Sequence, residues 1–232
     1  MKQEEEKSNT IISNLVNKYG LKSVVFENTE KNFRTFKEEM RDLVKAQKEN
    51  ARKGCPDMPF DYRDVGQFQF ELLFGSDILV FILHTNVFEF DRSHEVRRTS
   101  YIVEENSRSY CGVIKIYNFL SDSFKYDRLN DIGYLVARIF INKENHYYIE
   151  GKREISQIYN NFSTAVLDQD SIREIINSAM MYSINFDLLA PPYENIVEVT
   201  VEEMQEYMQN TRMRTGKRLG FRFQADSTGG AF

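Results

Sequence analysis

The sequence predicts an α+β fold, in which an antiparallel β-sheet of about five to six strands, mostly a meander, is flanked by N-terminal and C-terminal helices. Two observations carry this prediction. Apolar residues recur with the helical period of 3.6 near both ends of the chain and with the strand period of 2 in its middle. The loops between successive strands are shorter than the dozen or more residues that a parallel crossover needs. Helices grouped around such a meander are typical of the α+β class.

The first section of the chain predicts two helices. Apolar residues from Ile11 to Tyr19 follow helical spacing, and Gly20 stands where a left-handed C-terminal cap would lie, so a helix is predicted over about 4–19. Asn28 or Thr29 is expected to cap the second helix. The buried stripe of this second helix consists of Phe33, Phe36, Met40, Leu43 and Val44. The loop at 54–59, with two of the four prolines, ends the helical section.

Strand spacing begins at Phe68. The next run, 78–83, is apolar on both faces, as expected for a central strand that is covered on both sides. Further strands are predicted over 87–90, 100–104, 112–119, 134–141 and 146–150. The polar loop 142–145 is of hairpin length and separates the last two.

Helical spacing returns after the strands, over 155–162 and 172–179. Ser171 and Glu174 fit a capping box, in which each side chain satisfies a backbone donor of the first helical turn. Residues 190–193 are expected to break this helix, a short strand is predicted over 196–199, and a second capping box at 200–203 precedes a helix near 204–208.

The chain divides into three parts that together form one domain. Residues 1–59 are predicted to be a helical segment that packs on the sheet, residues 60–224 an α+β core with C-terminal helices, and residues 225–232 a mobile tail. We find no internal repeat.

Composition excludes several classes of protein. The 232 residues contain 30 Lys and Arg against 35 Asp and Glu, and the resulting charge of −5 argues against a globally basic nucleic-acid binder. The charged N-terminus lacks the apolar run of a signal peptide, and the most apolar stretch is far too short to span a membrane. Two cysteines are too few for a disulfide framework or a cysteine-based zinc site. We expect a cytoplasmic protein with no membrane contact, no cofactor and no bound metal.

Motifs for catalysis are incomplete. Residues 215–218 resemble the end of a P-loop, but the first Gly and the Mg-binding hydroxyl are missing, and His94 is not followed by the second His of a zincin. One pair remains: His84 and Cys111 lie on different predicted strands and would form a nucleophilic pair if the strands brought them together. The alternative is a hydrogen-bonded histidine and an inert buried cysteine. We therefore predict no catalytic residues.

Two features favour binding. In the first, Lys115, Tyr117 and Phe119 share one face of their strand, while Tyr134, Arg138 and Phe140 share one face of the next. If the register places both sets on the same side, the sheet presents rings and cations that suit bases or an anionic small ligand. The alternative is that helices cover this face and the aromatics belong to the core. The predicted ligand-binding residues are Lys115, Tyr117, Tyr134, Arg138 and Phe140.

The second feature is a basic segment near the C-terminus. Its five cations, with Phe221 and Phe223 interleaved, suit the binding of phosphate or nucleic acid despite the negative total charge. A solvated chain end, or an intramolecular partner for the acidic first helix, is the alternative. The cations are Arg212, Arg214, Lys217, Arg218 and Arg222.

Three functions are compatible with these features. The leading hypothesis is a non-catalytic cytoplasmic regulatory or adaptor module that binds a partner protein or a small ligand, with terminal helices able to pack across a homodimer. The second is a nucleic-acid-associated protein that uses the basic C-terminal segment. The third is an enzyme of unrecognised type that uses His84 and Cys111.

Overall fold

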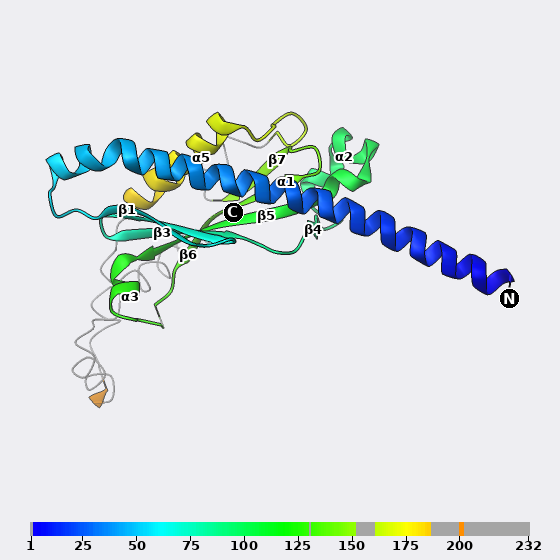
Figure 1. Cartoon of the computed structure of the whole chain (residues 1–232), viewed down its shortest axis with the longest axis horizontal. Helices are drawn as coiled ribbons and strands as arrows, with labels where there is room; N and C mark the ends of the chain where they lie inside the picture. The colour runs from blue at the N-terminus through cyan, green and yellow to red at the C-terminus, as the bar shows by residue number, and fades with distance from the viewer. Residues whose placement is uncertain (1, 130, 152–160, 187–199, 202–232) are drawn as a thin grey trace, which may run out of the picture.

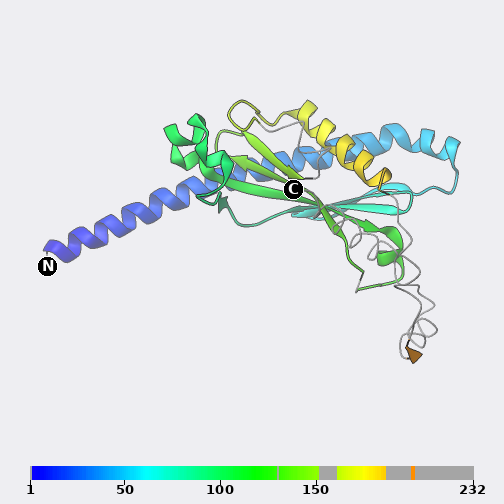
Figure 2. The same ribbon diagram turned by 180° about the vertical axis from the view of Figure 1, so that it is seen from behind.

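The computed structural model of the chain describes residues 2–129, 131–151, 161–186 and 200–201, and it confirms the α+β class with an antiparallel sheet. Helices α1 (Lys2–Gly54) and α5 (Gln169–Ile184) lie side by side on one face of the sheet. Figures 1 and 2 show this two-layer arrangement from opposite sides, with the N-terminal part of α1 projecting beyond the sheet.

The sheet has seven antiparallel strands. Its order is β1-β2-β3-β5-β6-β7, and the short strand β4 pairs with β5. The strands are β1 (Phe60–Gly66), β2 (Gln69–Phe74), β3 (Asp77–Leu83), β4 (Phe88–Glu89), β5 (Tyr110–Leu120), β6 (Tyr134–Asn142) and β7 (Tyr147–Gly151). Strand β1 was not predicted, because its charged residues mask the alternation of Phe60 and Tyr62. Such charges are typical of an edge strand.

Helix α1 is one continuous helix of 53 residues, so the predicted division into two helices is wrong. Gly20 does not cap a helix: its backbone keeps the helical conformation rather than a positive φ. A mid-helix glycine costs about 1 kcal/mol relative to alanine. The helix continues through it because the apolar segment that follows, from Val25 onward, is buried against the sheet.

Aromatic packing joins α1 to the sheet. The Phe33 ring lies 5.2 Å from the ring of Phe70, which stacks on Phe81 at 4.5 Å, and Phe36 lies 6.1 Å from Phe81. Met40 and Val44 extend the same stripe, and all of these side chains are buried. The predicted stripe of the second helix is therefore the part of α1 that forms the main core.

Helix α1 approaches the sheet most closely where Thr29 meets Gly112 on β5. A Cβ atom on Gly112 would lie 2.1 Å from Thr29 Oγ1, and Thr29 is fully buried with its hydroxyl donating to the Val25 carbonyl at 2.7 Å. The absence of a side chain at residue 112 thus sets how near the helix lies to the strand.

A second, smaller core lies on the opposite face at one end of the sheet. It is covered by the 3₁₀ helix η1 (Glu95–Arg98), helix α2 (Ser100–Glu104) and the 3₁₀ helix η2 (Asn106–Ser109). The predicted strand over 100–104 is therefore a helix, because its adjacent residues Tyr101 and Ile102 are both buried rather than alternating. The second core comprises Phe90, Val96, Tyr101, Ile102, Cys111, Val113, Phe140, Tyr148 and Phe162.

The remaining helices complete the described part of the chain. Helix α3 (Ser121–Lys125) follows β5. Helix α5 begins after Asp168, whose side chain accepts from the Ser171 N–H at 2.8 Å. The cap is therefore Asp168 and not the predicted Ser171. The predictions over 155–160, 187–199 and 202–232, including the tail, lie outside the described residues, and none of the described helices is apolar enough over sufficient length to cross a membrane.

We expect Gly112→Ala to destabilise the protein by about 1–3 kcal/mol, because the new methyl group forces α1 away from β5. The change is measured by denaturant unfolding. The double variant Gly112→Ala with Thr29→Ala also removes Oγ1 and Cγ2 of Thr29, which lie close to the new methyl group. It should recover part of the lost unfolding free energy. An unchanged unfolding free energy for Gly112→Ala would show that this contact does not set the helix position.

Candidate functional site

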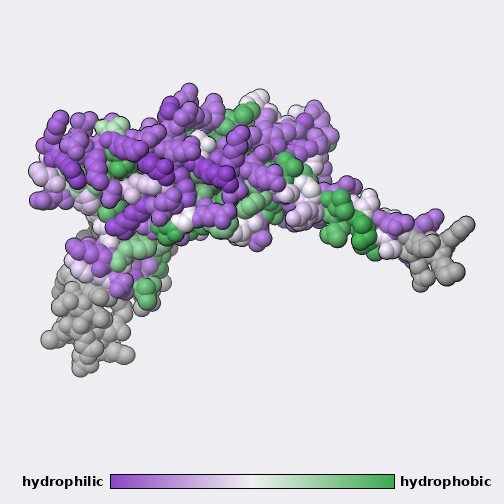
Figure 3. Space-filling model, in the orientation of Figure 1, coloured by the Kyte–Doolittle hydropathy of each residue, from purple (hydrophilic) through white to green (hydrophobic). Residues whose placement is uncertain are grey.

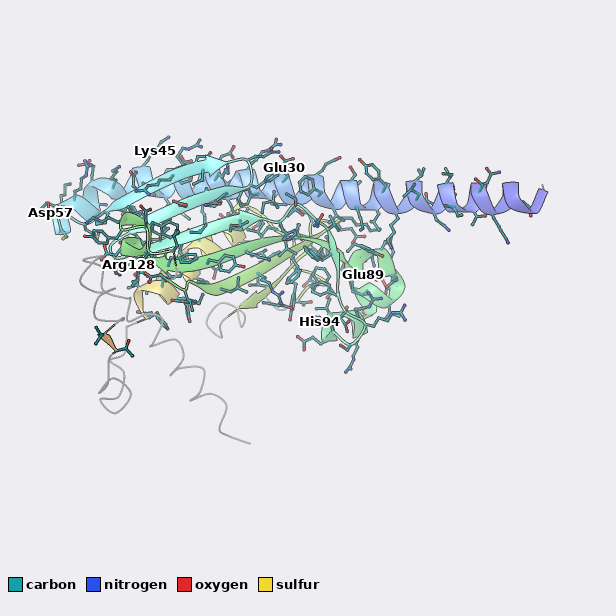
Figure 4. The ribbon with its side chains drawn as sticks, turned by 90° about the horizontal axis from the view of Figure 1, so that it is seen from below. Glu30, Lys45, Asp57, Glu89, His94 and Arg128 are labelled. Atoms are coloured by element: carbon teal, nitrogen blue, oxygen red, sulfur yellow. The ribbon has the colours of Figure 1, made fainter. Side chains whose placement is uncertain are left out.

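The sheet face opposite α1 and α5 divides into two parts. At one end, η1, α2 and η2 cover the second core. Beyond them, among the described residues, no helix packs over the middle of the face, which Figure 4 views with α5 behind the strands. This uncovered part is where the predicted residues Lys115 and Arg138 lie.

A row of charged side chains crosses this part of the face. Lys115 on β5 is directly opposite Arg138 on β6, and Arg138 is directly opposite Glu150 on β7. Ile82 on β3 flanks Lys115 on its other side. We call Lys115, Arg138 and Glu150 the charged row. Its three residues are half-buried, and Arg138 forms an ion pair with Glu150.

His94 joins the charged row from the segment before η1. Its Nε2 lies 3.1 Å from Glu150 Oε1, while its Nδ1 accepts from the Val96 N–H at 3.3 Å. Because Nδ1 is an acceptor, the neutral ring carries its proton on Nε2 and donates it to the carboxylate. Glu150 is thus bound from two sides, by Arg138 and by His94.

The second core holds this histidine in position. The His94 ring lies 4.7 Å from that of Phe90 and edge-on to Tyr148 at 5.8 Å. The Tyr148 hydroxyl donates to Glu95 at 3.0 Å, and burial together with this acceptor raises the pKa of Tyr148 to about 12. Figure 4 shows His94 beside the end of the sheet that α2 covers.

Arg97 fixes the segment that carries His94. Its guanidinium donates to Glu89 at 2.7 Å, to the Phe90 carbonyl at 3.1 Å and to Asn106 at 2.8 Å. The hydrogen bond from Arg97 holds the pKa of Glu89 below its usual range. The residues around the charged row therefore rest on an ordered support rather than on a free loop.

A β-bulge alters the predicted face of Tyr134. The register shifts so that Tyr117 is opposite Leu135 while Ile116 is opposite Ala137, leaving Val136 as the extra residue. Tyr134 therefore points to the α5 side, where its ring lies 4.8 Å from that of Phe186. The predicted sharing of one face by Tyr134 and Arg138 is wrong.

The remaining predicted aromatics lie on the same side as the charged row. Tyr117 is half-buried and adjoins Lys115 along the strand, and Phe119 follows in the same parity. Phe140 is buried in the second core, with the Arg138 guanidinium 5.4 Å from its ring centre. Phe140 is thus part of the wall of the site rather than an accessible surface.

His94 and Glu150 were absent from the predicted site. The hairpin loop at 142–145 implies the register that brings Glu150 opposite Arg138, so the sequence held a signal for Glu150. His94 is 56 residues from Glu150 and comes from an irregular segment. No periodic pattern marks such a contact.

The structure does not favour a catalytic pair of His84 and Cys111. Cys111 is 1% exposed, and burial raises the pKa of its thiol well above the ordinary value, whereas a nucleophilic cysteine needs a lowered one. His84 Nδ1 accepts from the Asn86 N–H at 3.0 Å, and its ring packs on Phe88. No hydrogen bond joins the two residues in the described chain.

Two other kinds of site were considered, an anion site in the basic C-terminal segment and a metal site. The basic residues Arg212, Arg214, Lys217, Arg218 and Arg222 lie outside the described residues. Among the residues that the structure describes, no group of three or more His, Cys, Asp or Glu is placed to hold a metal ion.

A groove of about 710 Å³ lies between α1 and α5, with Leu43, Phe60 and Met180 among its lining residues. Its buried carboxylate, Glu39, already binds Arg173 at 2.5 Å and also Gln169. These polar groups satisfy one another, so the groove does not indicate a class of ligand.

In comparisons with known proteins, no family model matches this chain, and no match was found among the curated proteins or the solved structures.

We expect the two cysteines to differ sharply in reactivity. Cys55 is exposed and should react rapidly with a thiol reagent such as DTNB in the native protein, whereas buried Cys111 should react only after unfolding. Counting the thiols that react before and after addition of denaturant measures this. Fast reaction of both thiols in the folded wild-type protein, together with fast reaction of the single remaining thiol in folded Cys55→Ser, would reopen the hypothesis of a nucleophilic Cys111.

Proposed function

We propose that this chain is a non-catalytic binding module whose charged row holds an anionic ligand. The single observation that carries this proposal is the cross-strand pairing of Lys115 with Arg138 on a part of the sheet that α1 and α5 leave uncovered. Like charges directly opposite each other destabilise a sheet. A position that breaks a folding rule in this way is a candidate for function.

The charge of the row supports an anionic ligand. Glu150 neutralises Arg138, but Lys115 forms no ion pair with any residue that the structure describes. Ile82 and Tyr117, its neighbours on the face, carry no charge that would compensate it. A carboxylate or phosphate group placed between Lys115 and Arg138 would remove the repulsion and accept hydrogen bonds from both cations.

The surroundings of the row restrict the rest of the ligand. Ile82, Tyr117 and Leu135 form an apolar and aromatic surface beside Lys115: Ile82 and Tyr117 are half-buried, and Leu135 is 37% exposed. Such a surface suits a flat or apolar group, while a few polar side chains fix its orientation. The ligand we propose is therefore a small molecule that joins a carboxylate or phosphate to an apolar or aromatic group.

Lys115→Met and Arg138→Gln should each weaken binding of such a ligand about 10- to 100-fold, because each removes a charge-assisted contact. Calorimetric titration with benzoate, citrate, phenyl phosphate and AMP as probes measures the affinity. Lys45→Met is the matched control, since Lys45 is 71% exposed on the far side of α1. Equal affinity in Lys115→Met and wild type, or no binding of any probe, would contradict the proposal.

The same variant separates a binding role from a structural one. Without ligand, Lys115→Met should raise the unfolding free energy by about 0.2–1 kcal/mol, because it removes the repulsion from Arg138. Denaturant unfolding of the wild-type and Lys45→Met proteins provides the comparison. A loss of stability in Lys115→Met would show that this lysine is there to support the fold.

A further inference from the structure

The first part of α1 has an apolar surface with nothing packed against it among the described residues. The helix projects beyond the sheet (Figure 1). Its first fully buried residue among those described is Val25. Figure 3 shows apolar surface on the projecting part. The exposed fractions of its apolar residues are 64% for Ile11, 55% for Ile12, 61% for Leu15, 61% for Val16 and 72% for Tyr19.

This projecting segment is a poor helix on its own. Between Ser8 and Gly20 it is dominated by Ser, Asn, Thr, Gly and β-branched residues, which have low helix propensity. Isolated helices of about 12–15 residues are marginal in water even with alanine-rich sequences. A partner that covers the apolar surface would supply the missing stability.

The exposed residues continue the stripe that packs on the sheet. Ile12, Leu15 and Tyr19 stand at steps of three and four residues, and the same heptad frame leads on to Phe26, Phe33, Phe36 and Met40. From Phe26 onward this protein's own sheet covers the stripe. Before residue 22 the stripe requires a second surface, and a spacing of this kind suits another helix.

We propose that the segment 4–22 of α1 pairs with the same segment of a second copy of this chain as an antiparallel two-helix coiled coil. In the register that centres the pair, Ile12 faces the partner's Leu15, and Leu15 faces the partner's Ile12. Ser8 then faces the partner's Tyr19. The arrangement is self-complementary, as a two-fold interface must be.

Charge determines the direction of pairing. The sequence has glutamates at positions 4, 5 and 6 and lysines at 18 and 22. In the antiparallel register, where the numbers of facing residues add up to 27, Glu6 lies beside Lys22 of the partner. A parallel pair would instead place glutamates against glutamates and lysines against lysines, which is unfavourable. This inference is independent of the proposed ligand site.

The exposed apolar area is large enough for a specific interface. Burying one aliphatic side chain removes on the order of 100 Å² from water. Five such residues in each copy give about 1,000 Å² in the pair, which is the lower limit for a specific interface.

Sedimentation equilibrium of the full chain between about 1 and 100 µM tests the proposal. We expect a dimer at the upper end, and Leu15→Asp should raise its dissociation constant about 30-fold or more, since it puts a charge at the centre of the interface. Val103→Asp is the matched control, because Val103, at 72% exposed, is as accessible as Leu15, at 61%, but lies on α2. It should remain dimeric.

Two further measurements define the direction. Lys22→Glu should weaken the dimer, because it places a carboxylate beside Glu6 of the partner, whereas Lys45→Glu, also on α1 but near its other end, should not. In a Cys55→Ser background, a spin label on Lys22→Cys should lie about 26 Å from its counterpart along the helix axis, since 17 residues separate the two positions. A separation near 10 Å would indicate parallel pairing and overturn the proposed register.

Other results would overturn the proposal altogether. A chain that stays monomeric at 100 µM has no such interface. A monomer that binds phosphatidylcholine and phosphatidylglycerol vesicles through the same residues, with binding lost in Leu15→Asp, would show that the surface contacts lipid instead. Near-ultraviolet circular dichroism of each variant checks that the sheet domain stays folded, so a loss of dimer is not a loss of fold.

Discussion

The contact between the apolar stripe of α1 and the sheet is the interaction on which the rest of the fold depends. A sheet with one apolar face must have that face covered, and Phe33 and Phe36 of α1 pack on β2 and β3 while Met40 belongs to the same core. Helix α5 then packs beside α1, with Glu39 of α1 bound to Arg173 of α5. The position of α5 is therefore set partly through α1.

The two faces of the sheet follow different physical rules as a result. On the helical side, the packed positions are mostly apolar and the close approach of Thr29 to Gly112 fixes the spacing. On the other side, the described helices η1, α2 and η2 cover the end where Phe90 and Tyr148 are buried, and next to that cover lies the charged row. The second core thus provides a rigid support beside Lys115 and Arg138, whose charges are only partly neutralised. Such a support suits the binding of a polar ligand.

The sequence indicated the fold well where periodicity was long and clear. The strands at Ile78 and Lys115, the stripe at Phe33 and the overall class follow directly from spacing. It failed at Gly20, where an isolated glycine looked like a helix end although tertiary packing further along carries the helix through. It also failed at 100–104, because a five-residue apolar run does not distinguish a strand from a short buried helix.

The candidate site was predicted in part, for reasons of the same kind. Strand parity places Lys115, Tyr117 and Arg138 on one side, and the register confirms that placement. The alternation of strand faces predicts the wrong side for Tyr134, because the extra residue Val136 reverses it. The sequence does not reveal this bulge, since an apolar run such as Leu135–Ala137 looks the same with or without one. The contact of His94 with Glu150 depends on tertiary structure alone.

The unbroken course of α1 has a consequence for how the molecule tolerates change in length. The stripe before Tyr19 and the stripe after Phe26 share one helical phase, with no loop between them to absorb an inserted or deleted residue. One added residue near Gly20 would turn the projecting segment by about 100° and shift it by about 1.5 Å relative to the sheet. The continuous helix therefore fixes the direction in which its projecting end presents the apolar residues relative to the sheet.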